Sequence, residues 1–384
     1  MKWNWELKDW PNFSYNNKEL EELELEFIKN CGKLLGAMKH INKDDEEQLH
    51  IELISDEALK TSKIEGEVLD RDSIQSSIRK HFGLKTDNKR VSPAERGIAA
   101  MMVDVYQNFA DPLTDLKLYN WHKMLMNGRM DVLDTGCYRT DPEPMQIISD
   151  PLFKLIIHYE APPANKILSE MRSFIEWFAN SNTKEKKLPN LIRASIAHWY
   201  FVSIHPFEDG NGRIARALSE YSLAQSLGHP TLIALSYTIE NNRKEYYAQL
   251  AKHNTSNDIT QWILYFSKVI IDAQKNTEKR LEFLISKTKM FDSLKGKLNP
   301  RQEKVLLRMF REGIDGFKGG LSANNYISIT NTTTATASRD LRNLVEYKVL
   351  ERKGKLKHTR YYLNRPIQAA NATLPCLKNI SAGV

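Results

Sequence analysis

One stretch of the 384-residue chain brings together an imidazole, two carboxylates, an amide and two guanidinium groups. It reads His205-Pro206-Phe207-Glu208-Asp209-Gly210-Asn211-Gly212-Arg213 and continues to Arg216. The imidazole can act as a general base, because its ordinary pKa of about 6.5 leaves much of it neutral near pH 7. The arginines offer the planar fork of donors that suits phosphate oxygens. A carboxylate can hold Mg²⁺, which prefers oxygen ligands. This combination indicates phosphate chemistry.

The flanking residues predict the elements that position this stretch. Apolar residues recur at helical spacing over 191–202, and a helical pattern resumes over 214–220. Pro206 rules out a regular helix through the stretch and favours an extended His205. A second helix therefore begins near the paired glycines, and its free N–H groups and dipole make an anion site. The alternative is an ordinary connecting turn with an N-capping Asp209 and two solvent-exposed arginines.

The whole string resembles the signature of Fic-domain proteins, His-Pro-Phe-x-(Asp/Glu)-Gly-Asn-Gly-Arg-x-x-Arg, at every fixed position. Members of that family transfer a nucleotide monophosphate, usually AMP from ATP, to a hydroxyl side chain of a target protein. The resemblance implies that His205 deprotonates the hydroxyl and that Asp209 holds Mg²⁺ or Mn²⁺. It assigns the ATP phosphates to Gly210, Asn211, Gly212, Arg213 and Arg216. A phosphorylating relative has Ala and Lys at the two glycine positions, so this chain follows the nucleotidyl-transfer pattern.

A second match lies at Thr61-Ser62-Lys63-Ile64-Glu65-Gly66. Thr61 and Glu65 lie four residues apart and share a helix face, and Gly66 suits a helix C-terminus. An ordinary helix end explains this spacing equally well. The stretch also resembles the inhibitory helix of many Fic proteins, (Ser/Thr)-x-x-x-Glu-(Gly/Asn). That resemblance implies that Glu65 pairs with Arg216 and takes the place of the γ-phosphate. In some relatives the same glutamate helps to remove AMP.

Two further regions match the family less specifically. Tyr247 and Asn254 stand where relatives contact adenine, and a tyrosine face and an amide suit a base; core packing of the tyrosine is the alternative. The stretches 146–149 and 153–159, with a turn signal at Asp150-Pro151, predict two short strands. They form either a structural hairpin or the family's flap, which holds the target by strand addition. His122, on the apolar side of a predicted helix, is interpreted as a packed core residue.

The end of the chain predicts a separate domain. Helices over 301–310 and 335–344 precede two strands, 349–353 and 359–363, an order that resembles a winged helix-turn-helix. If this domain binds DNA, Arg339 and Arg342 enter the major groove and the 353–358 wing contacts phosphate. A packing or dimer-forming module is the alternative.

The fold class expected from these patterns is mainly α: a Fic-type helical core with a β-hairpin flap and a C-terminal winged helix-turn-helix domain. The expected segments are an N-terminal helical region (1–95) with the inhibitory helix near 55–66, a Fic core (96–270), a helical linker (271–297), a winged-helix domain (298–365) and a loose tail (366–384). Residues 71–112 are interpreted as a connection into the core.

The composition of the chain bears on its expected partners and cellular compartment. The net charge of +7 and pI near 9.0 favour acidic partners or nucleic acid. The three cysteines, Cys31, Cys137 and Cys376, lack metal-ligand spacing, which favours a reduced, cytoplasmic protein. There is neither a signal-peptide pattern nor an apolar run of about twenty residues, so no membrane partner is expected. A homo-oligomer is left open.

Two functions are compatible with the residues. The first is a self-inhibited protein adenylyltransferase that uses ATP and modifies a hydroxyl-bearing protein target or itself. The second is a nucleotide-sensing transcriptional regulator that binds DNA. The intact His205 favours the enzyme, because a pure sensor has little need of a general base.

Overall fold

The computed structural model describes residues 2–16, 18–86, 90–149, 156–311, 316–317 and 319–364. The chain divides into two compact units, Met1–Glu278 and Lys279–Val384. The division falls inside the 271–297 segment, for which the sequence predicts a helical linker. A single helix, α11 (Thr260–Ser293), covers most of that segment.

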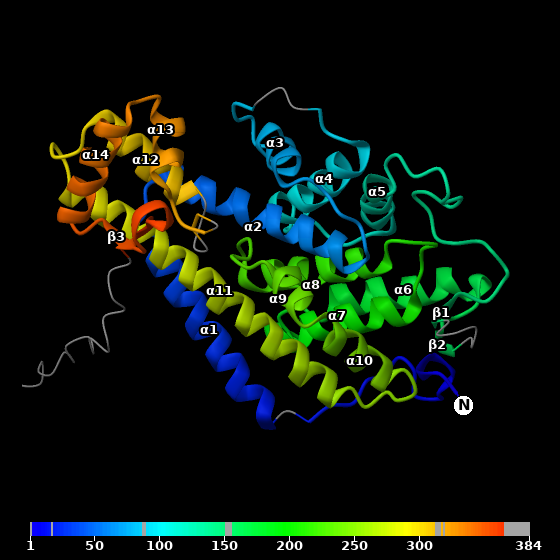
Figure 1. Ribbon diagram of the computed structural model, residues 1–384. Coiled ribbons are helices and arrows are strands. Elements are labelled where there is room, and N and C mark those ends of the chain that lie inside the picture. Colours follow the sequence, from blue (N-terminus) through cyan, green and yellow to red (C-terminus); the bar gives the residue numbers. More distant parts are fainter. Residues whose placement is uncertain are drawn as a thin grey trace, which may run out of the picture. The chain divides into compact units, whose positions relative to one another are not determined.

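The first unit is almost entirely helical, as Figure 1 shows. Its elements are η1 (Asn4–Glu6), α1 (Lys18–Met38), α2 (Lys43–Ile64), α3 (Arg71–His81), α4 (Pro93–Gln107), α5 (Asp115–Leu125), β1 (Gln146–Ser149), β2 (Ile156–Glu160), α6 (Ala164–Asn180), α7 (Asn190–Ile204), α8 (Asn211–Leu227), α9 (Leu235–Asn241), α10 (Arg243–His253) and the first part of α11. The predicted mainly-α fold class is confirmed.

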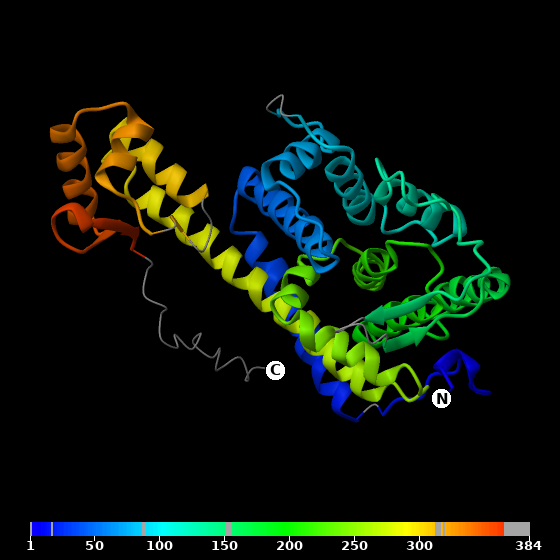
Figure 2. The same cartoon turned by 45° about the vertical axis from the view of Figure 1, so that its right-hand side comes forward.

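The core of this unit is built around α7 and α8. Both helices are buried on nearly all sides, as expected for a helix that is apolar around its whole circumference. α6 packs on α7, and α2, α4 and α5 pack on α8; Figures 1 and 2 show the central pair in green among these helices. The loop between α7 and α8 is therefore held by a rigid, dehydrated framework.

A buried arginine ties three of these helices together. The Arg193 guanidinium donates to the carbonyls of Phe178 and Ser222 at 2.9 and 3.0 Å. It also donates to the hydroxyl of Ser181 and the side-chain oxygen of Gln225, both at 3.0 Å. The side chain is completely buried, so these neutral acceptors replace the water that the charge has lost.

Residues 71–112 are not the simple connection that the sequence predicts. They contain α3 and α4. Asp70 caps α3 through the Ser73 N–H, and α4 opens with a capping box at Ser92–Glu95 and a proline in its first turn. The local capping signals were present in the sequence. The polar composition of α3 hides its amphipathic face, which buries only a few residues such as Ile74 and Ile78.

The hairpin predicted near the middle of the chain is present. β1 and β2 pair antiparallel, with an irregularity between Ile147 and Ile148. The Tyr159 hydroxyl donates to the Ser203 carbonyl at 2.5 Å, which fastens β2 to the end of α7. The predicted turn at Asp150-Pro151 lies outside the described residues.

The second unit has a core of its own. It contains the end of α11, then α12 (Pro300–Arg311), α13 (Ala323–Thr330), α14 (Thr334–Glu346), β3 (Leu350–Lys353), η3 (Leu356–His358) and β4 (Arg360–Leu363). β3 and β4 pair antiparallel, and Leu321 bridges to Tyr361 beside them. α13 was not predicted. It is short and rich in β-branched and Asn residues of modest helix propensity, and a Ser322 cap starts it.

The buried residues of this unit come from each of its helices. Val305, Tyr326, Leu341 and Leu350 are among the members of a continuous apolar cluster. The nearly buried Asp340 accepts hydrogen bonds from Arg301, Tyr326 and Asn299, at 2.9 to 3.0 Å. The predicted tail, 366–384, lies outside the described residues. Over the described part of the chain, none of the helices is both long and apolar enough to span a bilayer.

We predict that Arg193→Met destabilises the protein by about 3 kcal/mol, because it leaves buried carbonyl and hydroxyl acceptors without a donor. Urea unfolding followed by tryptophan fluorescence measures the loss. The control is Arg172→Met, at an exposed position of α6, which should change stability by less than about 0.5 kcal/mol. Equal effects of the two substitutions would contradict the structural role of Arg193.

Candidate active site

The loop that joins α7 to α8 begins with a residue in an unusual conformation. His205 has φ 51° and ψ 58°, in the left-handed region, so the prediction of an extended His205 is wrong. A following proline disfavours the right-handed helical region, and a left-handed residue is a common way to end a helix. The His205 N–H closes α7 by donating to the Phe201 carbonyl at 3.0 Å. Such strain in a non-glycine residue is typical of functional sites.

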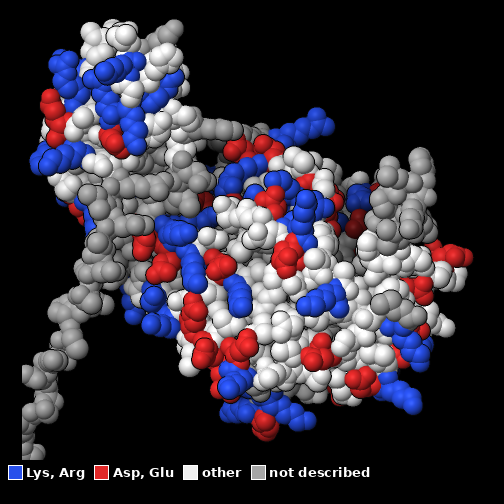
Figure 3. Space-filling view, turned by 60° about the horizontal axis from the view of Figure 1, so that its bottom comes forward, with Lys and Arg blue, Asp and Glu red and all other residues white. Residues whose placement is uncertain are grey.

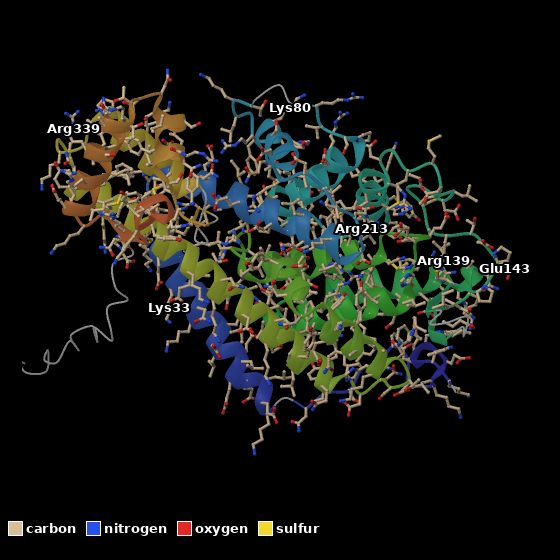
Figure 4. All side chains as sticks on the ribbon, viewed as in Figure 1. Lys33, Lys80, Arg139, Glu143, Arg213 and Arg339 are labelled. Carbon is tan, nitrogen blue, oxygen red and sulfur yellow. The ribbon has the colours of Figure 1, made fainter. Side chains whose placement is uncertain are left out.

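Arg139 holds this part of the loop from another segment of the chain. Its Nε donates to the His205 carbonyl at 2.9 Å, and its backbone N–H donates to the Pro206 carbonyl at 2.9 Å. Its guanidinium also donates to the Pro162 carbonyl. The side chain is buried, and Figure 4 labels it within the first unit. Sequence reasoning assigned Arg139 no role, because it lies outside the motifs.

The His205 imidazole is poised to accept a proton. Nδ1 lies 3.3 Å from the Val202 carbonyl, so the proton of the neutral ring belongs on Nδ1 and Nε2 is left as an acceptor. Burial lowers the pKa of His205 to about 4. The ring is therefore neutral near pH 7, which a general base requires.

The middle of the loop is held by an amide and an aromatic stack. The Asn211 side chain accepts from the Phe207 N–H at 2.9 Å and donates to the Phe207 carbonyl at 2.7 Å. Phe207 is buried and stacks on His122, with ring centroids 4.2 Å apart. The interpretation of His122 as a packed core residue is confirmed. Asn211, expected to contact phosphate, serves in this structure to fix the shape of the loop.

The N-terminus of α8 is rich in glycine, and the Glu65 side chain covers it. Gly210 is the N-cap residue, with φ 82°, so Asp209 does not cap the helix. The Glu65 carboxylate lies over the first turn: a Cβ added at Gly212 would stand 2.5 Å from Glu65 Oε1. An anion thus occupies the end of the helix that attracts anions, and only glycine at 212 leaves room for it.

Glu65 reaches this position from α2 and pairs with Arg216. Arg216 Nη2 lies 2.7 Å from Glu65 Oε1. Arg216 Nε donates to Thr61 Oγ1 at 2.8 Å, and Nη2 also donates to the Thr61 carbonyl at 3.1 Å. Gly66, with φ 90°, turns the chain away after the helix. Thr61 and Glu65 therefore hold one completely buried guanidinium from a single face of α2.

A second group of charges lies beside this pair. Arg213 Nη1 is 2.8 Å from Glu67 Oε2, and Arg213 Nη2 is 3.3 Å from Asp209 Oδ1. Asp209 Oδ2 in turn lies 2.9 Å from Arg129 Nη1. Glu67 and Arg129 belong to no motif, and sequence reasoning missed both. They are found only because the fold brings the turn after α2 and the segment after α5 to the start of α8.

The two signature arginines retain unused donors. Among the described residues, Arg216 Nη1 and Arg213 Nε are buried without a hydrogen-bond partner. Buried donors of a charged group normally find acceptors. An anion richer in oxygen than one carboxylate, such as a polyphosphate, would supply them.

Asp209 fits a divalent cation. Partial burial acts to raise the pKa of this carboxyl, but the charge of Arg213, the Gly210 N–H and Arg129 together hold it below its usual value, so it is ionised. Within the described ranges, no cluster of three or more His, Cys, Asp or Glu side chains could hold a metal. A cation at Asp209 would thus take one protein carboxylate and complete its shell with phosphate oxygens and water, as Mg²⁺ does.

The two residues predicted to contact adenine lie in different surroundings. The Tyr247 hydroxyl is 3.4 Å from Glu65 Oε2, and the Arg243 guanidinium lies over the Tyr247 ring at 5.6 Å. The ring is 39% exposed, so Tyr247 borders the site. Asn254 instead donates to the His158 carbonyl of β2 at 3.0 Å, which connects α10 to the hairpin.

Comparison with known proteins agrees with this geometry. Residues 112–223, which include the loop and both arginines, match the model of the Fic/DOC family. This part of the chain is thus similar to the Fic/DOC family. Residues 3–84, which include α2 and its turn, match a domain of unknown function, DUF4172. The Fic domain and the DUF4172 domain thus supply the two sides of the Arg216–Glu65 contact.

Relatives of the Fic domain are protein adenylyltransferases. Protein adenylyltransferase fic-1 of Caenorhabditis briggsae is 34% identical over 102 residues, which are 27% of this chain and 18% of that protein. Protein adenylyltransferase Fic of Aedes aegypti is 33% identical over 161 residues, 42% of this chain and 28% of that protein. The alignments span less than a third of these relatives.

Solved structures support the fold. A Fic family protein from Desulfovibrio desulfuricans G20 has a TM-score of 0.50 and 20% identity, and the match covers 89% of this chain and 95% of that one. A Fic domain containing signaling protein from Bacteroides thetaiotaomicron also has a TM-score of 0.50, at 19% identity, over 68% of this chain and 97% of that one. At this identity the likeness concerns the fold alone.

We predict that the His205 ring signals in ¹H–¹³C NMR spectra stay constant from about pH 8 to about pH 5.5, where an ordinary histidine is already mostly protonated. The reason is that burial lowers the pKa of His205 to about 4, so the neutral ring persists. The signals are assigned by their absence from His205→Ala. A transition centred near pH 6.5 would contradict the desolvated, neutral imidazole.

Proposed function

We propose that this protein is a protein adenylyltransferase, which moves AMP from ATP to a hydroxyl side chain of a protein target or of itself and is inhibited by Glu65. One observation carries the proposal: the Glu65 carboxylate lies over Gly212 and pairs with the buried Arg216. A carboxylate is thus bound where the N-terminus of α8 and the guanidinium together form an anion site. The polyphosphate of ATP is the anion that the remaining buried donors would accept.

Each charged group of the site has a role in this proposal. Arg213 and Arg216 bind the β- and γ-phosphates, and the N–H groups at Gly210–Gly212 bind phosphate oxygens of the same chain. Asp209 holds Mg²⁺ or Mn²⁺, which when bound neutralises charge on the phosphates during transfer. Tyr247 and Asn254 border the adenine.

The transfer step uses the imidazole as a base. His205 Nε2 accepts the proton of the target hydroxyl while the hydroxyl oxygen forms a bond to the α-phosphorus of ATP. The bond from that phosphorus to the oxygen bridging to the β-phosphate breaks, and pyrophosphate leaves. The Nδ1 contact with Val202 and the Arg139 clamp on the backbone keep the ring oriented, which supports catalysis by positioning.

The hairpin offers a place for the target. Ile147, Ile148 and Ile157 are between 41% and 53% exposed, although large apolar side chains are usually covered. An extended target segment that pairs with an edge of this hairpin would cover them and place its hydroxyl near His205. We propose that β1 and β2 act as the flap of the Fic domain.

Inhibition follows from competition between two anions. With Glu65 in place, the γ-phosphate would meet a carboxylate on the guanidinium that should bind it. Because Arg216 is completely buried, removing an anion without replacing it costs several kcal/mol. The inhibitory helix and ATP therefore compete for one arginine.

We predict that Glu65→Gly raises AMP transfer from radiolabelled ATP to protein by about tenfold or more, which corresponds to at least about 1.4 kcal/mol. Loss of the carboxylate frees Arg216 for phosphate. Glu52→Gln, on the same helix, is the control and should leave transfer unchanged. In the Glu65→Gly background, His205→Ala should abolish labelling while ATP affinity changes less than about twofold. The proposal fails if Glu65→Gly transfers no more than the natural chain, or if His205→Ala transfers equally.

Charge distribution favours a second function for the second unit. Residues 279–384 contain 21 Lys and Arg but only 8 Asp and Glu, whereas residues 1–278 contain 34 and 40. In the face drawn in Figure 3, basic side chains dominate the second unit and are mixed with acidic ones on the first. All of the positive net charge therefore belongs to the second unit, and such a surface suits a nucleic-acid backbone.

The arrangement of elements in this unit supports DNA as that nucleic acid. A three-residue connection joins α13 to α14, and a hairpin follows, the order of a winged helix-turn-helix. Arg339 and Arg342 are exposed on α14, and Figure 4 labels Arg339 on the outer side of the unit. Lys353 and Lys355 are exposed in the hairpin. We infer that α14 enters the major groove and the hairpin contacts phosphates.

We predict that the full chain binds a fluorescent DNA duplex in anisotropy measurements, with an affinity that falls steeply between about 50 and 200 mM salt. Arg339→Gln should weaken binding about threefold or more, because it removes a contact at the groove. Lys304→Gln, an equal charge change at an exposed position of α12, should weaken it less. No binding at the lower salt concentration, or equal effects of the two variants, would overturn DNA recognition by α14.

A further inference from the structure

Arg129 contacts three carboxylates at one end of the proposed nucleotide site. It lies in the segment that follows α5, outside every motif. Its Nη1 is 2.9 Å from Asp209 Oδ2 and 3.6 Å from Glu67 Oε1. Its Nε and Nη2 donate to the two oxygens of Asp131, at 2.7 and 2.6 Å. One guanidinium therefore connects the expected metal ligand with the turn after the inhibitory helix.

We propose that Arg129 is an internal competitor for the metal: it pairs with the Asp209 oxygen that a divalent cation would use, and the cation must displace it to bind. The inference rests on the proposed function in one respect, namely that Asp209 is the metal ligand. It adds to that function a residue that sets how much metal the site requires.

The contacts of Asp209 support this role. Its Oδ1 accepts from the Gly210 N–H and from Arg213. Its Oδ2 accepts from Arg129. A metal that used Oδ2 would stand within a few ångströms of the Arg129 guanidinium, and two cations at that separation repel strongly in a partly dehydrated site. The two cannot share the carboxylate in the present arrangement.

Burial decides which of the two arginines yields. The Arg213 side chain is only 3% exposed, so moving its charge away from Asp209 and Glu67 would leave a buried, unpaired cation. The Arg129 side chain is 31% exposed, and its second partner, Asp131, is 66% exposed. Arg129 can therefore leave Asp209, keep its ion pair with Asp131 and remain hydrated. It is the displaceable cation, and Arg213 is the permanent one.

Glu67 links this competition to the inhibitory turn. Its Oε2 holds Arg213 at 2.8 Å, and its Oε1 lies near Arg129. Glu67 is two residues beyond Glu65. One turn of chain therefore contacts Arg216, which is proposed to bind phosphate, and also Arg129, which pairs with the proposed metal ligand. Removal of the Glu65 carboxylate frees Arg216 but leaves Arg129 on Asp209. A chain with Glu65→Gly should therefore still require a high metal concentration.

The first experiment measures Mn²⁺ binding to the full chain without nucleotide, by electron paramagnetic resonance of free Mn²⁺. Arg129→Gln should raise the Mn²⁺ affinity about fivefold or more, because the competing cation is gone. Arg129→Lys, which keeps the charge but loses the fork that grips Asp131 and Asp209 together, should give a smaller rise. Adding Asp209→Asn should abolish the gain. Arg172→Gln makes the same charge change at an exposed position of α6 and should leave the Mn²⁺ affinity unchanged.

The outcomes of that experiment are decisive. Unchanged Mn²⁺ affinity in Arg129→Gln overturns the proposal. The Mn²⁺ affinity gained in Arg129→Gln could also persist when Asp209→Asn is added, or appear equally in Arg172→Gln. Either result would mean that only the net charge matters, and would overturn the proposal.

A second experiment separates Arg129 from the proposed function. In the Glu65→Gly background, binding of a fluorescent ATP analogue is measured with EDTA and over a Mg²⁺ titration. Arg129→Gln should lower the Mg²⁺ concentration for half-maximal binding and leave affinity in EDTA within about twofold. Equal weakening in EDTA and Mg²⁺ would make Arg129 a phosphate ligand and overturn the proposal. If the Glu65→Gly chain binds no nucleotide, the proposed function fails, and the Mn²⁺ result still decides the role of Arg129.

Discussion

The site depends on one guanidinium that has no access to water. Arg216 is completely buried in the core between α2 and α8, where a charge without a partner costs several kcal/mol. The protein must therefore provide an anion at this point in every state. In the structure the anion is Glu65. If ATP binds here, its phosphate takes the same place, and the two states exclude each other for an electrostatic reason.

The rest of the site is rigid compared with this exchangeable contact. Asn211 bridges both backbone groups of Phe207, and Arg139 bonds the His205 carbonyl. None of these contacts, nor the Val202 contact that sets the tautomer of the imidazole, is made by a residue of α2. Under the proposed function, regulation acts on anion access alone. The proposed displacement of Arg129 extends the same logic from the phosphate-binding arginines to the metal ligand Asp209.

Much of the fold and part of the site could be predicted from residue patterns. The buried helices before and after the loop, the hairpin and the long α11 follow from periodicity, which is a local property. α3, α4 and α13 were missed. α3 is polar and α13 is short and β-branched, so that packing more than propensity stabilises them. α4 was within reach of the sequence, because it has both a capping box and a buried apolar face. The predicted conformation of His205 was wrong. The residue ends α7 in the left-handed region, and this helix-ending conformation prevailed over the extended one that Pro206 favours for the residue before it.

The sequence by itself determined which functional groups stand side by side on the loop, since their spacing along one turn and one helix leaves few arrangements. It also placed Thr61 and Glu65 on one helix face. The resemblance to a known motif implied the pair of Glu65 and Arg216, which are 151 residues apart, but no spacing within the chain encodes it. Only the tertiary structure decided that Arg129 meets Asp209, 80 residues away. Those partners meet because α2 and α5 pack on α8. A pairing across packed helices depends on the shape of their whole interface, and no local spacing encodes it.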